Sequence, residues 1–80
     1  MEKKYYIVGL RPVIREIFPD MNKFYAMEWD TGEFKLDMRY NHEILFDPSG
    51  ESREVDKKEF DEYVTNKRNE RELPQTPYWY

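Results

Sequence analysis

The sequence has 80 residues, of which 39% are hydrophobic and 38% charged, and its net charge is -4. A chain of this length has room for one small core, so we expect a single domain and no large enclosed active site. Its negative charge repels phosphate backbones on average, which argues against nucleic-acid binding. The absence of cysteine excludes disulfides, thiolate metal sites and thiol nucleophiles.

No part of the sequence approaches the ~18 consecutive apolar residues of a membrane span. The first six residues include two lysines, but no long apolar segment follows them as it would in a secretory signal. We therefore expect no membrane association and a cytoplasmic location.

The first part of the chain contains one clear strand and one ambiguous segment. Residues 5–8 are aromatic and β-branched, which favours a strand, and we expect it at a sheet edge. Pro12 suits the first turn of a helix and Pro19 would end it, so the spacing predicts a short helix over residues 11–18. The apolar residues that recur at this spacing are Val13, Ile14, Ile17 and Phe18. Because three of them are β-branched, a strand over residues 13–18 is the alternative.

A β-hairpin follows. Residues 23–30 alternate in character, and so do residues 34–40, which is the period of a strand. The turn between them contains Gly32, which can adopt a positive φ. The first strand should present Tyr25, Met27 and Trp29 on one face, and the second should present Phe34, Leu36, Met38 and Tyr40.

The second half predicts further strands and a helix. Residues 43–46 read as a third strand, residues 47–50 as a turn, and residues 51–55 as a short fourth strand. Asp56 and Glu59 have the spacing of a capping box, so a helix should begin there. Its apolar stripe, extended by the lysine stem, consists of Phe60, Tyr63, Val64 and Lys67.

These elements predict an α+β fold. We expect an antiparallel sheet of three to four strands, with a C-terminal helix and a short N-terminal helix packed on one face. Residues 1–71 would form the domain. Residues 72–80 contain two prolines and would form an extended aromatic tail.

No motif indicates catalysis, a metal or a cofactor. His42 is the only histidine, and no nucleophile motif accompanies it, so a solvated turn histidine is the better interpretation. Asp47, Ser49 and Glu51 offer oxygen ligands but lack the spacing of a calcium loop, and a turn explains them better. We expect no enzyme activity.

Two groups of residues are candidates for binding a partner. The first is the tail triplet Tyr78, Trp79 and Tyr80, which either covers an open part of the sheet or anchors a partner protein. Pro74 and Pro77, just before the triplet, have the P-x-x-P spacing of a proline-rich ligand. The second is Arg11 and Arg15, which would share one face of the short helix. They form a solvated face or bind an acidic group.

Residues 12–56 resemble PepSY-like domains. The resemblance lies in the Phe18-Pro19 end of the predicted helix, the turn Asp30-Thr31-Gly32-Glu33, and the run Glu43-Ile44-Leu45-Phe46-Asp47-Pro48-Ser49-Gly50 leading to Val55-Asp56. It implies a helix packed on an antiparallel sheet and a role in binding or inhibiting another protein. The chain differs from that family in having no export signal, an additional N-terminal strand and an aromatic tail.

The sequence therefore predicts a small interaction module that binds another protein, of the inhibitor or immunity type. Acidic charge and many aromatic residues suit such a role. The alternative is a homo-oligomer that binds a small anionic ligand at a subunit seam through Arg11 or Arg15.

Overall fold

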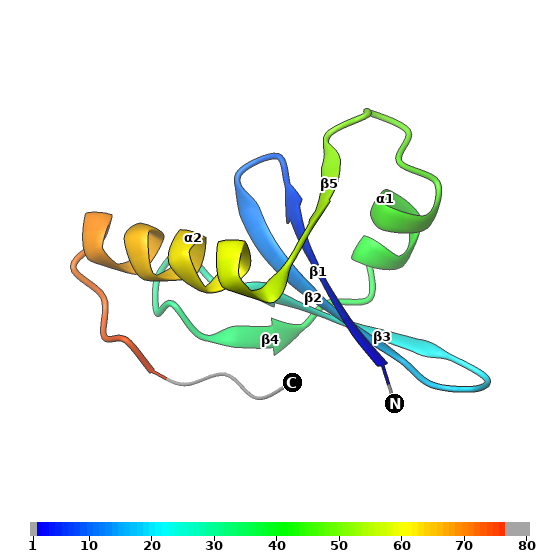
Figure 1. Cartoon of the computed structure of the whole chain (residues 1–80), viewed down its shortest axis with the longest axis horizontal. Helices are drawn as coiled ribbons and strands as arrows, with labels where there is room; N and C mark the ends of the chain where they lie inside the picture. The colour runs from blue at the N-terminus through cyan, green and yellow to red at the C-terminus, as the bar shows by residue number, and fades with distance from the viewer. Residues whose placement is uncertain (1, 77–80) are drawn as a thin grey trace.

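The computed structural model describes residues 2–76, which form one five-stranded antiparallel sheet with two helices (Figure 1). The strand order is β4-β3-β2-β1-β5. Bounds are β1 Glu2–Val8, β2 Arg11–Ile17, β3 Asn22–Met27, β4 Phe34–Leu36, α1 Tyr40–Leu45, β5 Ser52–Val55 and α2 Lys57–Glu70. The predicted α+β class and its C-terminal helix are confirmed.

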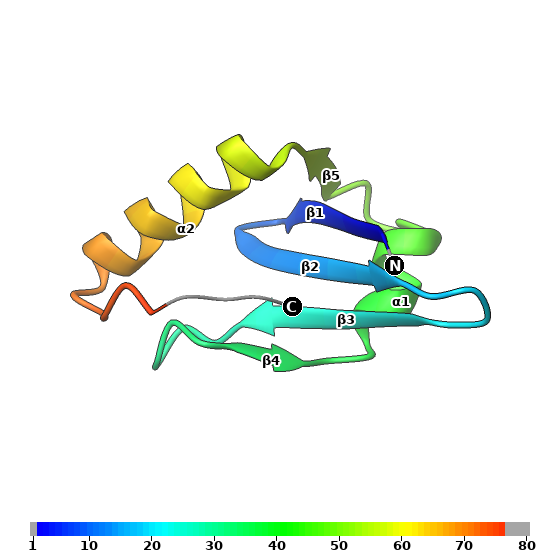
Figure 2. The ribbon, with the colours of Figure 1, turned by 60° about the horizontal axis from the view of Figure 1, so that its bottom comes forward.

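The two helices cover opposite faces of the sheet, so the core has two parts (Figure 2). Under α2 the buried residues are Ile7, Ile14, Met27, Phe34, Val55, Phe60 and Val64. Under α1 they are Tyr6, Val13, Phe24 and Ala26, with Tyr40 and Ile44 of α1 packed against them. Neighbours along a strand point to opposite faces, which is why Tyr6 and Ile7 belong to different parts of the core.

The predicted helix over residues 11–18 is wrong, and the alternative strand is confirmed as β2. This strand pairs with β1 on one side and β3 on the other. Val13 and Ile14 are both completely buried because each faces one of the two core parts. A strand buried on both faces loses its polar and apolar alternation, so its apolar spacing imitates a helix. Pro12 is tolerated because pairing with β3 begins only at Val13, so no bond from its nitrogen to β3 is required.

The strand at residues 5–8 is confirmed within β1, but its predicted place at a sheet edge is wrong. β1 lies between β2 and β5. The edge is occupied instead by β5, which confirms the predicted strand at residues 51–55. The hairpin of β3 and β4 is also confirmed, although β4 ends at Leu36 rather than Tyr40.

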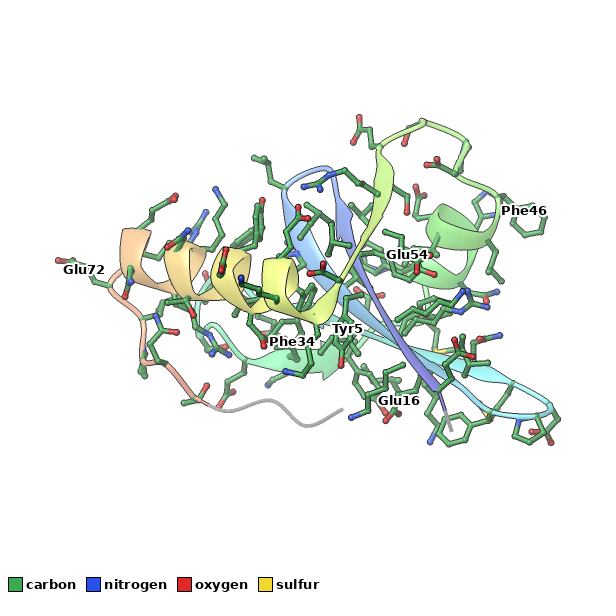
Figure 3. All side chains as sticks on the ribbon, in the orientation of Figure 1. Tyr5, Glu16, Phe34, Phe46, Glu54 and Glu72 are labelled. Atoms are coloured by element: carbon green, nitrogen blue, oxygen red, sulfur yellow. The ribbon has the colours of Figure 1, made fainter. Side chains whose placement is uncertain are left out.

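The predicted strand at residues 43–46 is wrong, because most of this segment belongs to α1. Tyr40 and Ile44 are four residues apart, so a helix brings both onto the same face of the sheet. The helix starts from Asp37, whose side chain accepts a hydrogen bond from the Arg39 N–H and whose carbonyl accepts one from the Tyr40 N–H. Phe46 follows the helix and projects from the molecule, 71% exposed (Figure 3).

The capping prediction for α2 is confirmed in its first half. The Asp56 carboxylate accepts a hydrogen bond from the Glu59 N–H at 2.8 Å. The Glu59 carboxylate does not complete a capping box but pairs with Arg53 at 2.6 Å. From this start, Phe60 and Val64 face the sheet, and Phe60 lies 5.0 Å from Tyr5 and 5.9 Å from Phe34 between ring centroids.

Arg68 continues the buried stripe of α2 although it carries a charge. It is 3% exposed, and its Nε and Nη2 atoms donate to the Gly32 carbonyl at 3.0 and 2.5 Å. Its Nη1 atom donates to the carbonyl of Thr76, which ties residues 72–76 to α2. Gly32 has a φ of 75°, and a Cβ there would lie 3.2 Å from Arg68 Nε, so glycine fits both the turn and the arginine.

No helix among the described residues combines the length and apolar character needed to cross a membrane.

Phe60→Ala should destabilise the fold by about 3–5 kcal/mol, since it removes a fully buried ring from the centre of the α2 core. That is a large part of the ~5–15 kcal/mol available to a small domain. Urea unfolding followed by circular dichroism measures it. Leu10→Ala, at a position 69% exposed, is the control and should leave the midpoint nearly unchanged.

Arg68→Lys should also destabilise the fold, by about 1–3 kcal/mol, because an ammonium group does not reproduce the two-atom contact with the Gly32 carbonyl. The same urea experiment applies, with Arg53→Lys as the control at an exposed arginine. Equal midpoints for the two variants would contradict the role we assign to Arg68.

Candidate functional site

Two adjoining hollows open at the end of the sheet where β2 begins and β3 ends. Their volumes are about 630 and 350 Å³, and both are lined by Arg11, Trp29 and Arg39. We call them together the Trp29 groove. Its other lining residues are Val8, Gly9, Leu10, Ala26, Glu28, Asp30, Lys35, Leu36, Asp37, Tyr40, Glu43 and Glu51.

The wall formed by the β1–β2 turn is held in place from two sides. Gly9 has a φ of 62°, a conformation that glycine adopts without strain, and its N–H donates to the Glu51 carbonyl at 3.1 Å. The Tyr63 hydroxyl of α2 donates to the Leu10 carbonyl at 2.7 Å. Since the segment entering β5 and the helix α2 both fix this turn, one wall of the groove is set by the fold.

Trp29 connects the groove to the core. It is partly buried and packs against the α2 side of the core. The guanidinium carbon of Arg11 lies 5.5 Å from the centre of the Trp29 ring, and that of Arg71 lies 4.6 Å from it. Cations over an indole face are attracted by its quadrupole. The contacts therefore orient Trp29 between the end of α2 and the groove.

Arg39 and Asp37, in the segment that follows β4, form a bidentate ion pair in the lining of the groove. Arg39 Nε and Nη2 lie 2.9 and 2.6 Å from the two Asp37 carboxylate oxygens. The hydrogen bond from Arg39 lowers the pKa of the Asp37 carboxyl below its usual value, and the charge of Arg11 lowers it further. The same hydrogen bond raises the pKa of Arg39. Each charge of this pair is largely neutralised by the other.

The groove has a negative charge. Its lining contains five carboxylates, from Glu28, Asp30, Asp37, Glu43 and Glu51, and three cations, from Arg11, Lys35 and Arg39. Once the pair of Asp37 and Arg39 is set aside, four lining carboxylates remain against two lining cations, and Arg71 is a third cation close by at Trp29. The groove therefore attracts positive groups, and the partly exposed rings of Trp29 and Tyr40 offer apolar surface beside them.

The structure separates the two predicted arginines. Arg11 lines the groove, whereas Arg15 bonds elsewhere, to Asn22 at 2.9 Å and to the Tyr6 hydroxyl at 3.2 Å. Four residues apart in an extended strand, their Cα atoms are ~13 Å apart rather than adjacent as on a helix. The predicted tail site of Tyr78, Trp79 and Tyr80 lies outside the described residues.

The remaining candidates have ordinary environments. His42 is exposed as predicted, although in α1 rather than in a turn, and its ring lies 5.1 Å from that of Phe46. Asp47 makes a turn, as predicted, since its carbonyl accepts from the Gly50 N–H and its side chain accepts from the Ser52 N–H. Within residues 2–76, no group of three or more histidine, aspartate or glutamate side chains could hold a metal ion.

Sequence reasoning named only Arg11 of the groove residues as a binding candidate, and Trp29 and Arg39 are the central residues that it missed. The alternation of residues 23–30 places Trp29 only on a strand face, although its position directly before the Asp30-Thr31-Gly32 turn puts it at the end of the sheet. The spacing of Asp37 and Arg39, two residues apart after a strand, was the available signal for the ion pair.

Comparison of the chain with models of known protein families, with curated proteins and with solved structures finds no match. The resemblance of residues 12–56 to PepSY-like domains stays a prediction.

Asp37→Asn should lower stability at neutral pH and have little effect in acid. The lowered pKa of Asp37 means that its ion pair contributes stability above the carboxyl's unfolded pKa of ~3.9, and this contribution disappears as the pH falls through the folded value. Asparagine retains an oxygen that can accept the hydrogen bond from the Arg39 N–H, so the substitution removes only the negative charge. Urea midpoints of both proteins at neutral and acidic pH test this, and a difference that persists in acid would contradict it.

Proposed function

We propose that this protein is a non-catalytic cytoplasmic module that binds another protein through the Trp29 groove, as an inhibitor or immunity-type protein would. The segment bound would be extended and basic, with an apolar side chain placed on Trp29. The observation that carries the proposal is the combination, in one groove, of aromatic surface and an excess of carboxylates.

The composition of the groove supports a protein as the ligand. Tryptophan, tyrosine and arginine are the residues that contribute most to protein interfaces, and Trp29, Tyr40 and Arg11 all line it. Leu10 and Leu36, 69% and 58% exposed, add apolar surface. The wall at Leu10 is held by hydrogen bonds to its neighbours, so a ligand that binds there would cause little loss of conformational entropy in this turn.

Charge supports a basic partner over an acidic one. Four groove carboxylates, those of Glu28, Asp30, Glu43 and Glu51, form no salt bridge within the described residues. Lysine or arginine on a partner would be attracted by these four carboxylates, which are gathered around one hollowed surface. The same carboxylates would repel nucleic-acid phosphates and anionic metabolites.

The alternative, a homo-oligomer that binds an anion at a subunit seam, has less support. It depends on Arg11 or Arg15, yet Arg15 already donates to Asn22 and Tyr6. Arg11 shares its hollows with five carboxylates. An anion beside Arg11 would therefore meet more repulsion than attraction.

A displayed library of random peptides, selected against the immobilised protein, tests the proposed function. We expect the enriched peptides to carry net positive charge and at least one large apolar residue. Binding to Trp29→Ala should be at least about tenfold weaker, which corresponds to ~1.4 kcal/mol. Binding to Glu51→Lys should also weaken, and most strongly at low ionic strength.

The matched control is Glu62→Lys, which makes the same charge change at an exposed position of α2 away from the groove. It should bind the selected peptides as the wild type does. If no peptide is enriched, or if Trp29→Ala and Glu51→Lys bind as well as Glu62→Lys, the proposed function is wrong.

A further inference from the structure

A row of apolar side chains crosses the face of the sheet that α2 covers, and it ends at the edge strand β4. The strand registers place side by side Val55, Tyr5, Ile14, Tyr25 and Leu36. The row is buried at Val55 and Ile14, whereas Leu36 at its end is 58% exposed. A leucine left this exposed at the end of an apolar row would be covered if another strand followed β4.

The backbone of Leu36 is oriented to accept such a strand. The Glu28 N–H donates to the Glu33 carbonyl and the Asp37 N–H donates to the Phe24 carbonyl, both at 2.8 Å. In an antiparallel ladder the residues that bond to a given neighbour alternate, so Glu33, Lys35 and Asp37 face β3. The N–H and carbonyl of Leu36 therefore point away from the sheet, along its edge.

We propose that β4 pairs with β4 of a second copy of this chain, antiparallel and about a two-fold axis at Leu36. The charges select this partner. Pairing centred on Leu36 sets each Lys35 opposite Asp37 of the other copy, so each Asp37 carboxylate would hold this ammonium in addition to its own Arg39, and no like charges lie directly opposite. The sheet of one copy then continues into that of the other, and the two apolar rows meet.

The two neighbouring registers are disfavoured by the same residues. Residues whose N–H and carbonyl point out of the sheet pair only with one another, so the closest alternatives shift the axis to Lys35 or to Asp37. These registers set Lys35 against Lys35, or Asp37 against Asp37, of the second copy, and like charges directly opposite are destabilising. Both registers also separate the two Leu36 side chains.

The contact is short, because β4 is only three residues long. Exposed Met38, 44% accessible, lies two residues beyond Leu36 and adds apolar area beside the pairing. An interface this small falls below the area of stable complexes, so the dimer is weak and its population rises with protein concentration. This inference does not rest on the proposed function, and its test uses the protein alone.

Charge reversal tests the register by sedimentation equilibrium over a wide concentration range. Lys35→Glu sets a glutamate against Asp37, and Asp37→Lys sets two lysines together, so each variant alone should dissociate more than the wild type. An equimolar mixture should recover the dimer, because both charge pairs are then opposite. Lys58→Glu, at an exposed position of α2, is the control and should dimerise as the wild type does.

Single-cysteine variants give a second test that leaves the charges unchanged. Directly opposite residues in a hydrogen-bonded antiparallel pair have Cα atoms ~5.5 Å apart, within the range of a disulfide. The chain has no native cysteine, so Leu36→Cys should cross-link under mild oxidation into a single dimer. Leu10→Cys, at a similarly exposed leucine, should cross-link several-fold more slowly.

Circular dichroism of each variant shows that the fold is retained before its association is compared. The proposal is overturned if Leu36→Cys cross-links no faster than Leu10→Cys. It is also overturned if the wild type is a monomer at every concentration, or if mixing the two charge variants restores no dimer. Loss of peptide binding by Trp29→Ala would leave these results unaffected.

Discussion

A sheet that is apolar on both faces needs cover on both sides, and this requirement shapes the whole molecule. Val13 and Ile14 are adjacent in the central strand β2 and both are completely buried, one under each helix side. α2 supplies fourteen residues of cover and α1 only six. Because α1 is too short to span its face, the sheet end beyond Tyr40 stays open. The Trp29 groove is that uncovered end, so the candidate site follows from how the core is closed.

Two arginines at the far end of α2 join that helix to the groove. Arg68 fixes the β3–β4 turn through the Gly32 carbonyl, and Arg71, three residues later, lies over Trp29. Within residues 2–76, every buried polar side-chain atom has a hydrogen-bond partner, so Arg68 is buried without an unmet donor. A guanidinium suits this place because its planar fork holds one carbonyl with two nitrogens. The position of Trp29 thus depends on contacts made by the core helix.

The sequence showed the period of an element most clearly where solvent lies opposite its buried face. This holds for α2, whose stripe includes Phe60, and for β4, where Phe34 is buried and Lys35 is exposed. Sequence reasoning misread β2, which is buried on both faces and so has no polar period, and α1, whose six residues hold too few turns to show one. The groove was not predictable in the same way. Arg11, Trp29 and Arg39 come from three separate segments and meet only through the strand order.

The edge strand β4 links the two surfaces that the structure leaves open. Lys35, Leu36 and Asp37 line the smaller hollow of the Trp29 groove, and they are also the residues whose order makes the strand self-complementary. A basic segment bound in this hollow would occupy the space beside Asp37 that Lys35 of a second copy would take. The two binding equilibria are linked. A ligand that binds the monomer more tightly than the dimer weakens dimerisation, and dimerisation weakens the binding of that ligand by the same factor. The dimer and the partner-binding function that we propose would therefore oppose each other at this short strand, and a higher protein concentration would favour the dimer.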